Sequence, residues 1–294
     1  MARRRRSLHF VPGGNDRMFT RALTLPADGL ILDLEDAVAP DRKAATRGVV
    51  REWLARHDFG GRERWVRMNP IATGLGEADL EETIAGRPDG YVVPKPGRAA
   101  DIREIARILD RLEQQHGIPN GATRLTVIAT ETPEGLLNIR EIATASPRTV
   151  AVSWGVEDLG AAMGLGRVRD EAGKYLDIPR YARVMCSVVA SAAGIEAIDT
   201  VFTDIANLAG LRRECEEGVA MGFTGKISIH PSQIAVINDV FTPTKEAVDE
   251  ARELVALFEV NARNGIFAFT FKGQMVDAPH LNRAKKLLAR AGVE

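Results

Sequence analysis

The fold of this chain is decided by Ile128-Ala129-Thr130-Glu131 and by Val152-Ser153-Trp154-Gly155-Val156-Glu157-Asp158. In each stretch a short apolar run passes directly into a turn or polar residue and then reaches an acid. Short apolar runs bounded in this way are typical of buried parallel strands. Because the functional residues of parallel α/β barrels follow the carboxyl ends of the strands, both stretches predict a barrel with a site at that end.

Similar stretches recur along the whole chain, and segments with helical periodicity separate them. The clearest helical segment is 98–116, which is apolar on one face, charged on the other and closed by Gly117. The eight candidate strands are 8–11, 29–34, 65–69, 91–93, 125–130, 150–154, 197–203 and 226–229. Eightfold alternation of strand and helix with right-handed crossovers predicts a (β/α)8 TIM barrel, and an open doubly wound sheet is the competing architecture.

The chain is longer than a barrel requires. It has 294 residues, whereas a (β/α)8 barrel needs about 250. We predict a catalytic barrel in residues 1–240 and a C-terminal extension in 241–294, with a helix, an aromatic strand at 266–271, a turn at Lys272-Gly273-Gln274 and a last helix. An exposed aromatic appendage needs a partner surface, so we expect it to pack on a neighbouring subunit of a homo-oligomer. Folding back under its own barrel is the alternative.

Composition and charge exclude several classes of protein. Lysine and arginine number 39 and aspartate and glutamate 40, so a general basic field for nucleic acid or a membrane surface is absent from the sequence. No run reaches the roughly 18 apolar residues that cross a bilayer. Cys186 and Cys215 suggest neither a disulfide framework nor a thiolate metal cluster. We therefore expect a soluble, cytoplasmic enzyme that acts on small molecules.

Polar residues follow most of the predicted strands, and a barrel would bring them to one mouth. They are Asp33, Glu35, Asp36, Arg67, Asn69, Lys95, Glu131, Glu157, Asp158, Asp204 and His230. So many carboxylates would repel one another unless Arg67, Lys95 and a divalent metal neutralise them. An oxygen ligand set without a Cys or His pair favours Mg²⁺.

Each of these residues also has a structural interpretation. Glu131 and Asp158 could instead cap the helices that follow them, and Asp36 is ambiguous in the same way. Arg67 lies between apolar neighbours and would be costly if it pointed inward unpaired, so it should meet a carboxylate or a bound anion. His230 is more typical of a satisfied structural histidine than of a catalytic base.

Two segments near the amino terminus could bind phosphate. Residues 12–16, Pro-Gly-Gly-Asn-Asp, could present backbone N–H groups to an anion, but they also read as a glycine turn with an Asn or Asp N-cap. The run Arg3 to Arg6 could hold the phosphates of a nucleotide-bearing substrate, although a solvated terminus is the simpler interpretation.

Taken in order, the motifs resemble the citrate lyase beta-subunit and malyl-CoA lyase family, over nearly the whole chain. They are Arg6-Ser7 with Phe10-Val11-Pro12-Gly13, Leu32-Asp33-Leu34-Glu35-Asp36-Ala37-Val38, Val66-Arg67-Met68-Asn69, Val93-Pro94-Lys95, Glu131-Thr132, Gly155-Val156-Glu157-Asp158-Leu159, Gly225-Lys226-Ile227, Ile229-His230-Pro231 and Gly273-Gln274-Met275-Val276-Asp277. The resemblance implies a (β/α)8 barrel in trimers or hexamers. It also implies Mg²⁺-dependent cleavage or formation of a bond between an acetyl- or propionyl-thioester and a 2-oxo acid.

The resemblance also implies roles for single residues. Glu131 and Asp158 match metal-binding carboxylates, and Glu35 and Asp36 match acids near the water shell of the metal. Arg67 matches an arginine that contacts the oxygen developing negative charge, and Lys95 matches a lysine of the mouth. The amides around Gly155, Val156 and Glu157 match a cradle for the 2-oxo acid carboxylate. Asp277 matches an acid that protonates the thioester enolate from a neighbouring subunit.

The function expected from these matches is that of a Mg²⁺-dependent lyase. It would cleave or form a β-hydroxyacyl-CoA such as malyl-, citramalyl- or citryl-CoA. A malyl-CoA-type thioesterase and an aldolase acting on pyruvate and an aldehyde would use the same metal site. A subunit that cleaves citryl-acyl-carrier protein within a complex is a further alternative, against which the long carboxyl-terminal segment with its own Asp277 argues.

Overall fold

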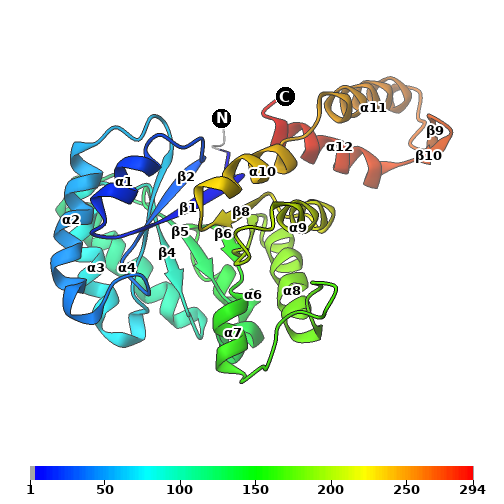
Figure 1. Ribbon diagram of the computed structural model, residues 1–294. Coiled ribbons are helices and arrows are strands. Elements are labelled where there is room, and N and C mark those ends of the chain that lie inside the picture. The colour runs from blue at the N-terminus through cyan, green and yellow to red at the C-terminus, as the bar shows by residue number, and fades with distance from the viewer. Residues whose placement is uncertain (1–3, 294) are drawn as a thin grey trace. The chain divides into compact units, whose positions relative to one another are not determined.

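A computed structural model describes residues 4–293 of the chain (Figure 1). Among these residues it contains two compact units, one formed by Arg5–Asn238 and the other by residues 239–293 with Arg4. The first unit is a closed parallel barrel. Arg3, which the sequence places in the arginine run, lies outside the described residues.

Eight strands form the barrel in sequence order. They are β1 Ser7–Pro12, β2 Gly29–Asp33, β3 Glu63–Arg67, β4 Gly90–Pro94, β5 Arg124–Ile128, β6 Thr149–Ser153, β7 Glu196–Asp199 and β8 Gly225–Ser228. β1 pairs in parallel with both β2 and β8, which closes the sheet. The predicted (β/α)8 barrel is therefore confirmed, and the open doubly wound sheet is wrong.

Three of the predicted strands run two or more residues too far at their carboxyl ends. β3, β5 and β7 end at Arg67, Ile128 and Asp199, whereas the sequence pattern continues to residues 69, 130 and 203. Met68 and Ala129 are still fully buried beyond the strands. An apolar residue indicates a buried position, whether or not its backbone is hydrogen-bonded in the sheet. The apolar pattern therefore continues past the strands into the loops that carry the site.

Helices surround the barrel (Figure 1). They are α1 Asp16–Ala22, α2 Lys43–Arg56, α3 Leu75–Thr83, α4 Ala99–Gln115, α5 Pro133–Leu137, α6 Ile139–Ala143, α7 Val156–Ala162, α8 Asp177–Ala193, α9 Leu208–Ala220 and α10 Pro231–Phe241, with short 3-10 turns η1 Pro40–Arg42, η2 Ile71–Thr73 and η3 Ile84–Gly86. α4 buries Ile102, Ile105 and Leu109 as its periodicity predicts. None of the helices between residues 4 and 293 has the length and apolar character needed to cross a bilayer.

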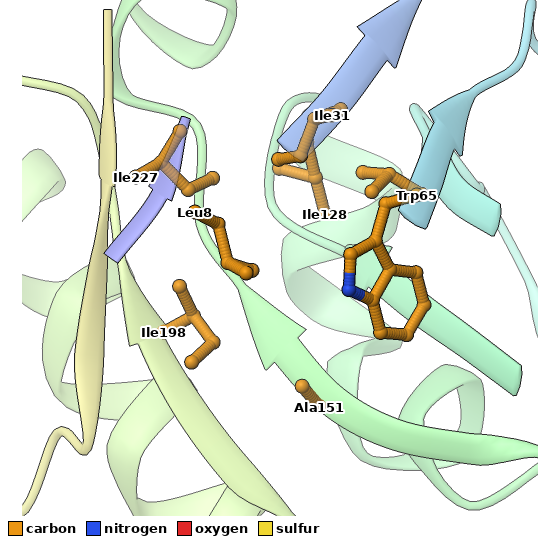
Figure 2. Packing of buried hydrophobic residues seen from close by; sticks show 8 residues of the cluster. Leu8, Ile31, Trp65, Ile128, Ala151, Ile198 and Ile227 are labelled. Carbon is orange, nitrogen blue, oxygen red and sulfur yellow. The ribbon is translucent and has the colours of Figure 1, made fainter. Parts of the chain in front are cut away.

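Each strand contributes one buried apolar side chain to a layer inside the barrel (Figure 2). The layer consists of Leu8, Ile31, Trp65, Val92, Ile128, Ala151, Ile198 and Ile227. Side chains alternate between the two faces of a strand, so residues two positions further along also face inward. Asp33 and Arg67 stand in that position after Ile31 and Trp65, at the carboxyl end of the barrel.

The carboxyl-terminal unit has a core of its own. It consists of α11 Lys245–Arg263, the antiparallel hairpin β9 Phe269–Phe271 and β10 Gln274–Val276, and α12 Ala278–Ala291. Lys272 and Gly273 form the turn with φ of 48° and 81°, as tight hairpin turns require. Phe258, Phe271 and Leu288 are buried in its core. The strand predicted at 266–271 is confirmed only in its last three residues. Packing on a neighbouring subunit stays a prediction.

Candidate active site at the carboxyl ends of the strands

Arg67 is the inward-facing last residue of β3 and is surrounded by carboxylates. Its guanidinium donates to both oxygens of Asp33, at 2.8 and 2.7 Å, and lies 2.8 Å from Glu35. The ring of Phe10 lies under it, 4.5 Å from Cζ. Burial alone disfavours the charge, but Asp33 and Glu35 outweigh burial and raise the pKa of Arg67. The prediction that Arg67 meets a carboxylate is confirmed.

Asp33 was predicted from the sequence to lie at the mouth of the barrel, but it was given no role there. It is directly paired with Arg67 across β2 and β3, and its carboxylate also accepts backbone N–H bonds from Glu35 and Ala37 at 2.9 and 3.3 Å. The signal in the sequence was its place two residues after an inward apolar residue, on the same face as Arg67. Asp33 therefore fixes both the arginine and the loop that carries Glu35 and Asp36.

Lys95 lies just beyond β4 and connects the four acids predicted for the site. Its backbone N–H donates to Glu131 Oε2 at 2.7 Å. Its ammonium lies 2.8 Å from Glu35, 3.3 Å from Asp36 and 3.2 Å from Asp158. Its φ is 52°, a left-handed conformation that is uncommon for a residue with a side chain. In that conformation the amide of Lys95 contacts Glu131 while its ammonium contacts Glu35, Asp36 and Asp158.

Glu131 is the most strongly perturbed acid of the cluster. Its side chain is buried, and burial together with the negative charges of Glu35 and Asp158 raises its pKa well above the ordinary value. Thr132, rather than Glu131, caps α5 by accepting from the backbone N–H of Gly135. The capping interpretation of Glu131 is therefore wrong, and its carboxylate is directed to the cluster.

Gly155 is needed for Glu131 to lie where it does. A Cβ atom added to Gly155 would stand 2.4 Å from Glu131 Cγ, a distance that real Cβ atoms essentially never show. Gly155 is also the N-cap residue of α7, and its N–H donates to Thr130 Oγ1 at 3.2 Å. Asp158 follows in the first turn of α7, where the helix dipole favours a negative charge.

The donor chemistry of this cluster fits a hard divalent cation. Within residues 4–293, no three His, Cys, Asp or Glu side chains are arranged to hold a metal ion. Mg²⁺ in proteins is commonly bound by one or two carboxylates and completed by water and substrate oxygens. Glu131 and Asp158 supply two carboxylates, and a cation between them would relieve the repulsion that raises the pKa of Glu131.

The other predicted residues are divided between the cluster and the rest of the molecule. Val156 is buried at the start of α7 and Glu157 beside it is exposed. Asp204 and His230 are exposed, and His230 Nδ1 pairs locally with Ser232 at 2.7 Å. Asp277 belongs to the carboxyl-terminal unit, where its Oδ1 lies 2.6 Å from His280 Nδ1 at the start of α12. The structure thus brings together Glu35, Asp36, Arg67, Lys95, Glu131 and Asp158.

The amino-terminal candidates for phosphate binding have structural partners. Asn15 caps α1 by accepting from Met18 N–H at 3.1 Å, so the glycine turn is an ordinary helix start. Arg5 pairs with Glu63 and Glu196, and Arg6 pairs with Asp28. In the described part of the run, Arg5 and Arg6 are therefore neither a solvated terminus nor free for a phosphate.

Comparison with known proteins gives consistent matches over most of the chain. The model of the HpcH/HpaI aldolase/citrate lyase family matches residues 6–231. Citrate lyase subunit beta of Escherichia coli K12 is 37% identical over 98% of this chain and 94% of its own length. A (3S)-malyl-CoA thioesterase of Cereibacter sphaeroides is 35% identical, over 97% of this chain and 94% of its own length. The structure of CitE from Mycobacterium tuberculosis, in complex with magnesium, acetoacetate and coenzyme A, matches with a TM-score of 0.78 and 35% identity, over 98% of both chains.

Proposed function

This chain belongs to the HpcH/HpaI aldolase/citrate lyase family, and on that premise we propose that it is a Mg²⁺-dependent carbon–carbon lyase acting on a β-hydroxyacyl-CoA. It is an enzyme of the lyase class, and the finer assignment rests on the cluster around Glu131. A buried acid with two negative neighbours, beside an arginine held by Asp33, supports metal-assisted chemistry on an anionic substrate. The substrate would be malyl-, methylmalyl-, citramalyl- or citryl-CoA. Methylmalyl-CoA would give propionyl-CoA and the others acetyl-CoA, each together with a 2-oxo acid.

The acids of the cluster would hold the cation and the 2-hydroxy-carboxylate end of the substrate. Mg²⁺ bound by Glu131 and Asp158 would supply Lewis acidity that makes loss of the substrate hydroxyl proton feasible near neutral pH. Glu35 and Asp36 would face its water shell. The backbone amides of Val156 and Glu157, at the start of α7, would cradle the carboxylate, while the Gly155 amide donates to Thr130.

The cationic residues would act on the thioester half. As the bond between the hydroxyl-bearing carbon and the methylene carbon breaks, its electron pair passes to the thioester and forms an enolate. Arg67 would stabilise that charge, and Lys95 would keep the neighbouring acids assembled. A carboxyl proton from Asp277 would then pass to the carbon next to the thioester and complete acetyl- or propionyl-CoA. The proton lost by the hydroxyl would leave to water, and water would return one to Asp277.

Asp277 would reach the site from a neighbouring subunit. The carboxyl-terminal segment from residue 241 exposes Phe267 and Met275, with 65% and 63% of their surface accessible. Apolar residues exposed to this degree favour an interface between copies of the chain, in a trimer or a hexamer. Asp277→Asn should keep Mg²⁺ affinity and lose about 10²-fold or more in turnover. Near-normal turnover would reject the role.

The test of the reaction itself is product analysis. The purified chain is incubated with Mg²⁺ or with EDTA against malyl-, methylmalyl-, citramalyl- and citryl-CoA, and products are identified by mass spectrometry. EDTA-sensitive acetyl- or propionyl-CoA plus a 2-oxo acid supports the lyase. In parallel, Glu131→Gln should lose Mg²⁺ binding in isothermal titration, and unchanged affinity would reject Glu131 as a ligand.

Two alternatives have specific support. The Cereibacter sphaeroides relative is named a malyl-CoA thioesterase at 35% identity, and free CoA plus a hydroxy acid would indicate that outcome. The Escherichia coli relative is a citrate lyase subunit, and turnover of a citryl-acyl-carrier protein without turnover of CoA thioesters would indicate a subunit that works in a complex.

A further inference from the structure

A cluster of buried charges lies outside the barrel interior, on strands next to the site and on the helices that cover them. Asp199 ends β7 and Lys226 lies in β8, and both are fully buried. Each directly follows or precedes an inward-facing apolar residue, Ile198 or Ile227, so both side chains point outward toward the helices. None of these groups takes part in the chemistry proposed above.

The charges within this cluster are mutually satisfied. Asp199 accepts from Arg183 of α8 at 2.8 Å and lies 3.4 Å from the ammonium of Lys226. Lys226 donates to Glu214 of α9 at 2.8 Å. Burial alone would disfavour the Asp199 carboxylate, but Lys226 and Arg183 outweigh it and lower the pKa of Asp199. Asp199 is therefore a fixed anion at neutral pH.

Trp154 connects this cluster to the site. It follows β6 immediately and precedes Gly155, and its indole N–H donates to Asp199 at 2.7 Å. Gly155 in turn lies against Glu131 and begins α7, which carries Asp158. A shift of Trp154 would therefore move Gly155, which lies against Glu131, and α7, which carries Asp158.

The chain that leaves Trp154 through α7 contacts the cluster again at Tyr175. Tyr175, after α7 and its loop, packs edge-on against Trp154 with ring centroids 5.1 Å apart. Its hydroxyl lies 3.2 Å from Glu214, and Arg169 pairs with that carboxylate as well. The segment 154–175 therefore begins at Trp154 and ends at Tyr175, and both end residues are hydrogen-bonded to the cluster.

We propose that Trp154, Asp199 and Tyr175 are positioning residues that hold the Gly155 to Asp158 segment in register with Glu131 for cation binding. A buried ion cluster is by itself weak evidence for stability. Here, however, Trp154 and Tyr175 at the two ends of one segment are both hydrogen-bonded to the cluster, so the cluster fixes the position of that segment. The inference rests on the proposed function, because it needs Glu131 and Asp158 to bind Mg²⁺.

The experiment compares Trp154→Phe with Trp65→Phe. Trp65 is also fully buried, and its indole N–H donates to Glu63 at 2.9 Å, but Glu63 is the first residue of β3, at the opposite end of the barrel. Both variants lose the same kind of hydrogen bond and the same ring volume. Both should therefore lose thermal stability. Only Trp154→Phe should weaken Mg²⁺ in isothermal titration, by about tenfold, as partners outside the ligand set typically do.

The outcomes distinguish failure of the positioning role from failure of the proposed function. Equal Mg²⁺ affinity in Trp154→Phe and wild type, or equal weakening in both variants, overturns the positioning role while the lyase proposal stands. A wild-type chain that binds no Mg²⁺ overturns the proposed function and this inference with it. If Trp154→Phe does not fold, Tyr175→Phe takes its place, because it removes only the hydroxyl near Glu214 and keeps the ring against Trp154. Wild-type Mg²⁺ affinity in that variant also overturns the role.

Discussion

Asp33 and Arg67 occupy directly paired positions on β2 and β3, and their side chains form two hydrogen bonds, of 2.8 and 2.7 Å, at the carboxyl end of the barrel. The pair is nearly excluded from water, with side-chain exposures of 3% and 11%. A two-point bond between a guanidinium and a carboxylate fixes the plane of the arginine as well as its position. Asp33 thus determines where the positive charge of Arg67 can meet a substrate.

Asp33→Asn should reduce turnover and leave the metal site intact. The amide keeps one acceptor, loses the negative charge and turns an N–H₂ group toward a donor, so Arg67 is no longer held in one plane. We expect kcat to fall about 10- to 100-fold, as is typical when a partner that orients a functional side chain is lost. Mg²⁺ affinity should stay close to that of wild type, because the proposed ligands Glu131 and Asp158 are unchanged. Steady-state kinetics and isothermal titration measure the two quantities.

Asp89→Asn is the matched control for this change. Asp89 pairs with Arg64 of the same strand at 3.3 Å, but that pair is partly exposed. A partly exposed ion pair contributes little, so this variant should turn over like wild type. If Asp33→Asn and Asp89→Asn behaved alike, Arg67 would not depend on its partner.

The sequence predicts the acids and cations of this cluster but not how they pair. The position of Arg67 between apolar residues predicted that it pairs with a carboxylate, but the sequence did not distinguish among Asp33, Glu35 and Asp36 as that partner. Choosing among them needs the register of β2 against β3 and the face of each side chain, which depend on where the strands begin. The strand ends were the least accurate part of the prediction, because burial continues past the ladder at Met68 and Ala129.

The contacts that no sequence pattern could supply are those between distant elements. Trp154 reads as the end of an apolar strand, and only the fold reveals that Asp199 accepts its N–H. The left-handed backbone of Lys95, between two prolines, is likewise a property of the assembled loop. Regular alternation of strand and helix is a local signal, and it predicted the barrel itself correctly.

Gly155→Ala should impair metal binding through Glu131. The new methyl group would stand 2.4 Å from Glu131 Cγ, so the buried carboxylate must move away from its place beside Asp158. We expect Mg²⁺ affinity to fall about tenfold or more, because the ligands of a cation must keep their geometry. Isothermal titration with Mg²⁺ measures the change.

Gly48→Ala is the control for the glycine substitution. Gly48 lies within α2, and an added Cβ there meets no atom of the described structure within 4 Å. Alanine in a helix interior should stabilise the protein by roughly 0.5 to 1 kcal/mol and leave Mg²⁺ binding unchanged. Wild-type affinity in Gly155→Ala would show that Glu131 tolerates the methyl group.

His9 should make the protein sensitive to acid. Burial lowers the pKa of His9 to about 4, with the charge of His230 a smaller contribution, although the bond to Ser228 opposes the shift. In the unfolded chain the same imidazole takes up a proton near pH 6.5. The unfolded state therefore binds more protons between these values, so stability is full above about pH 6.5 and falls as the pH decreases toward 4. The loss from this one group is at most roughly 3 kcal/mol.

His9→Asn tests this pH dependence. Asparagine can place a polar atom near the position of Nδ1, beside Ser228, but cannot take up a proton. The difference between the free energies of unfolding at pH 7 and pH 4.5, from urea titrations, should be smaller in the variant than in wild type. His116→Asn, at an exposed position, should keep the wild-type difference. An unchanged difference in His9→Asn would assign the acid sensitivity to other groups.

Lys95→Met should destabilise the metal-free protein more than the Mg²⁺-loaded one. The ammonium of Lys95 lies within 3.3 Å of Glu35, Asp36 and Asp158, and methionine keeps the apolar stem without the charge. Burial opposes the charge, but Glu35 outweighs it and raises the pKa of Lys95, so its contribution is present at neutral pH and is lost only above the ordinary lysine pKa. Without the ammonium the acids repel one another, which should cost on the order of 1 kcal/mol and a few degrees of Tm. Mg²⁺ supplies replacement positive charge, so saturating Mg²⁺ should raise the Tm of Lys95→Met by more than it raises the Tm of wild type. Equal shifts in thermal denaturation scans with Mg²⁺ and with EDTA would show that Lys95 does not compensate these carboxylates.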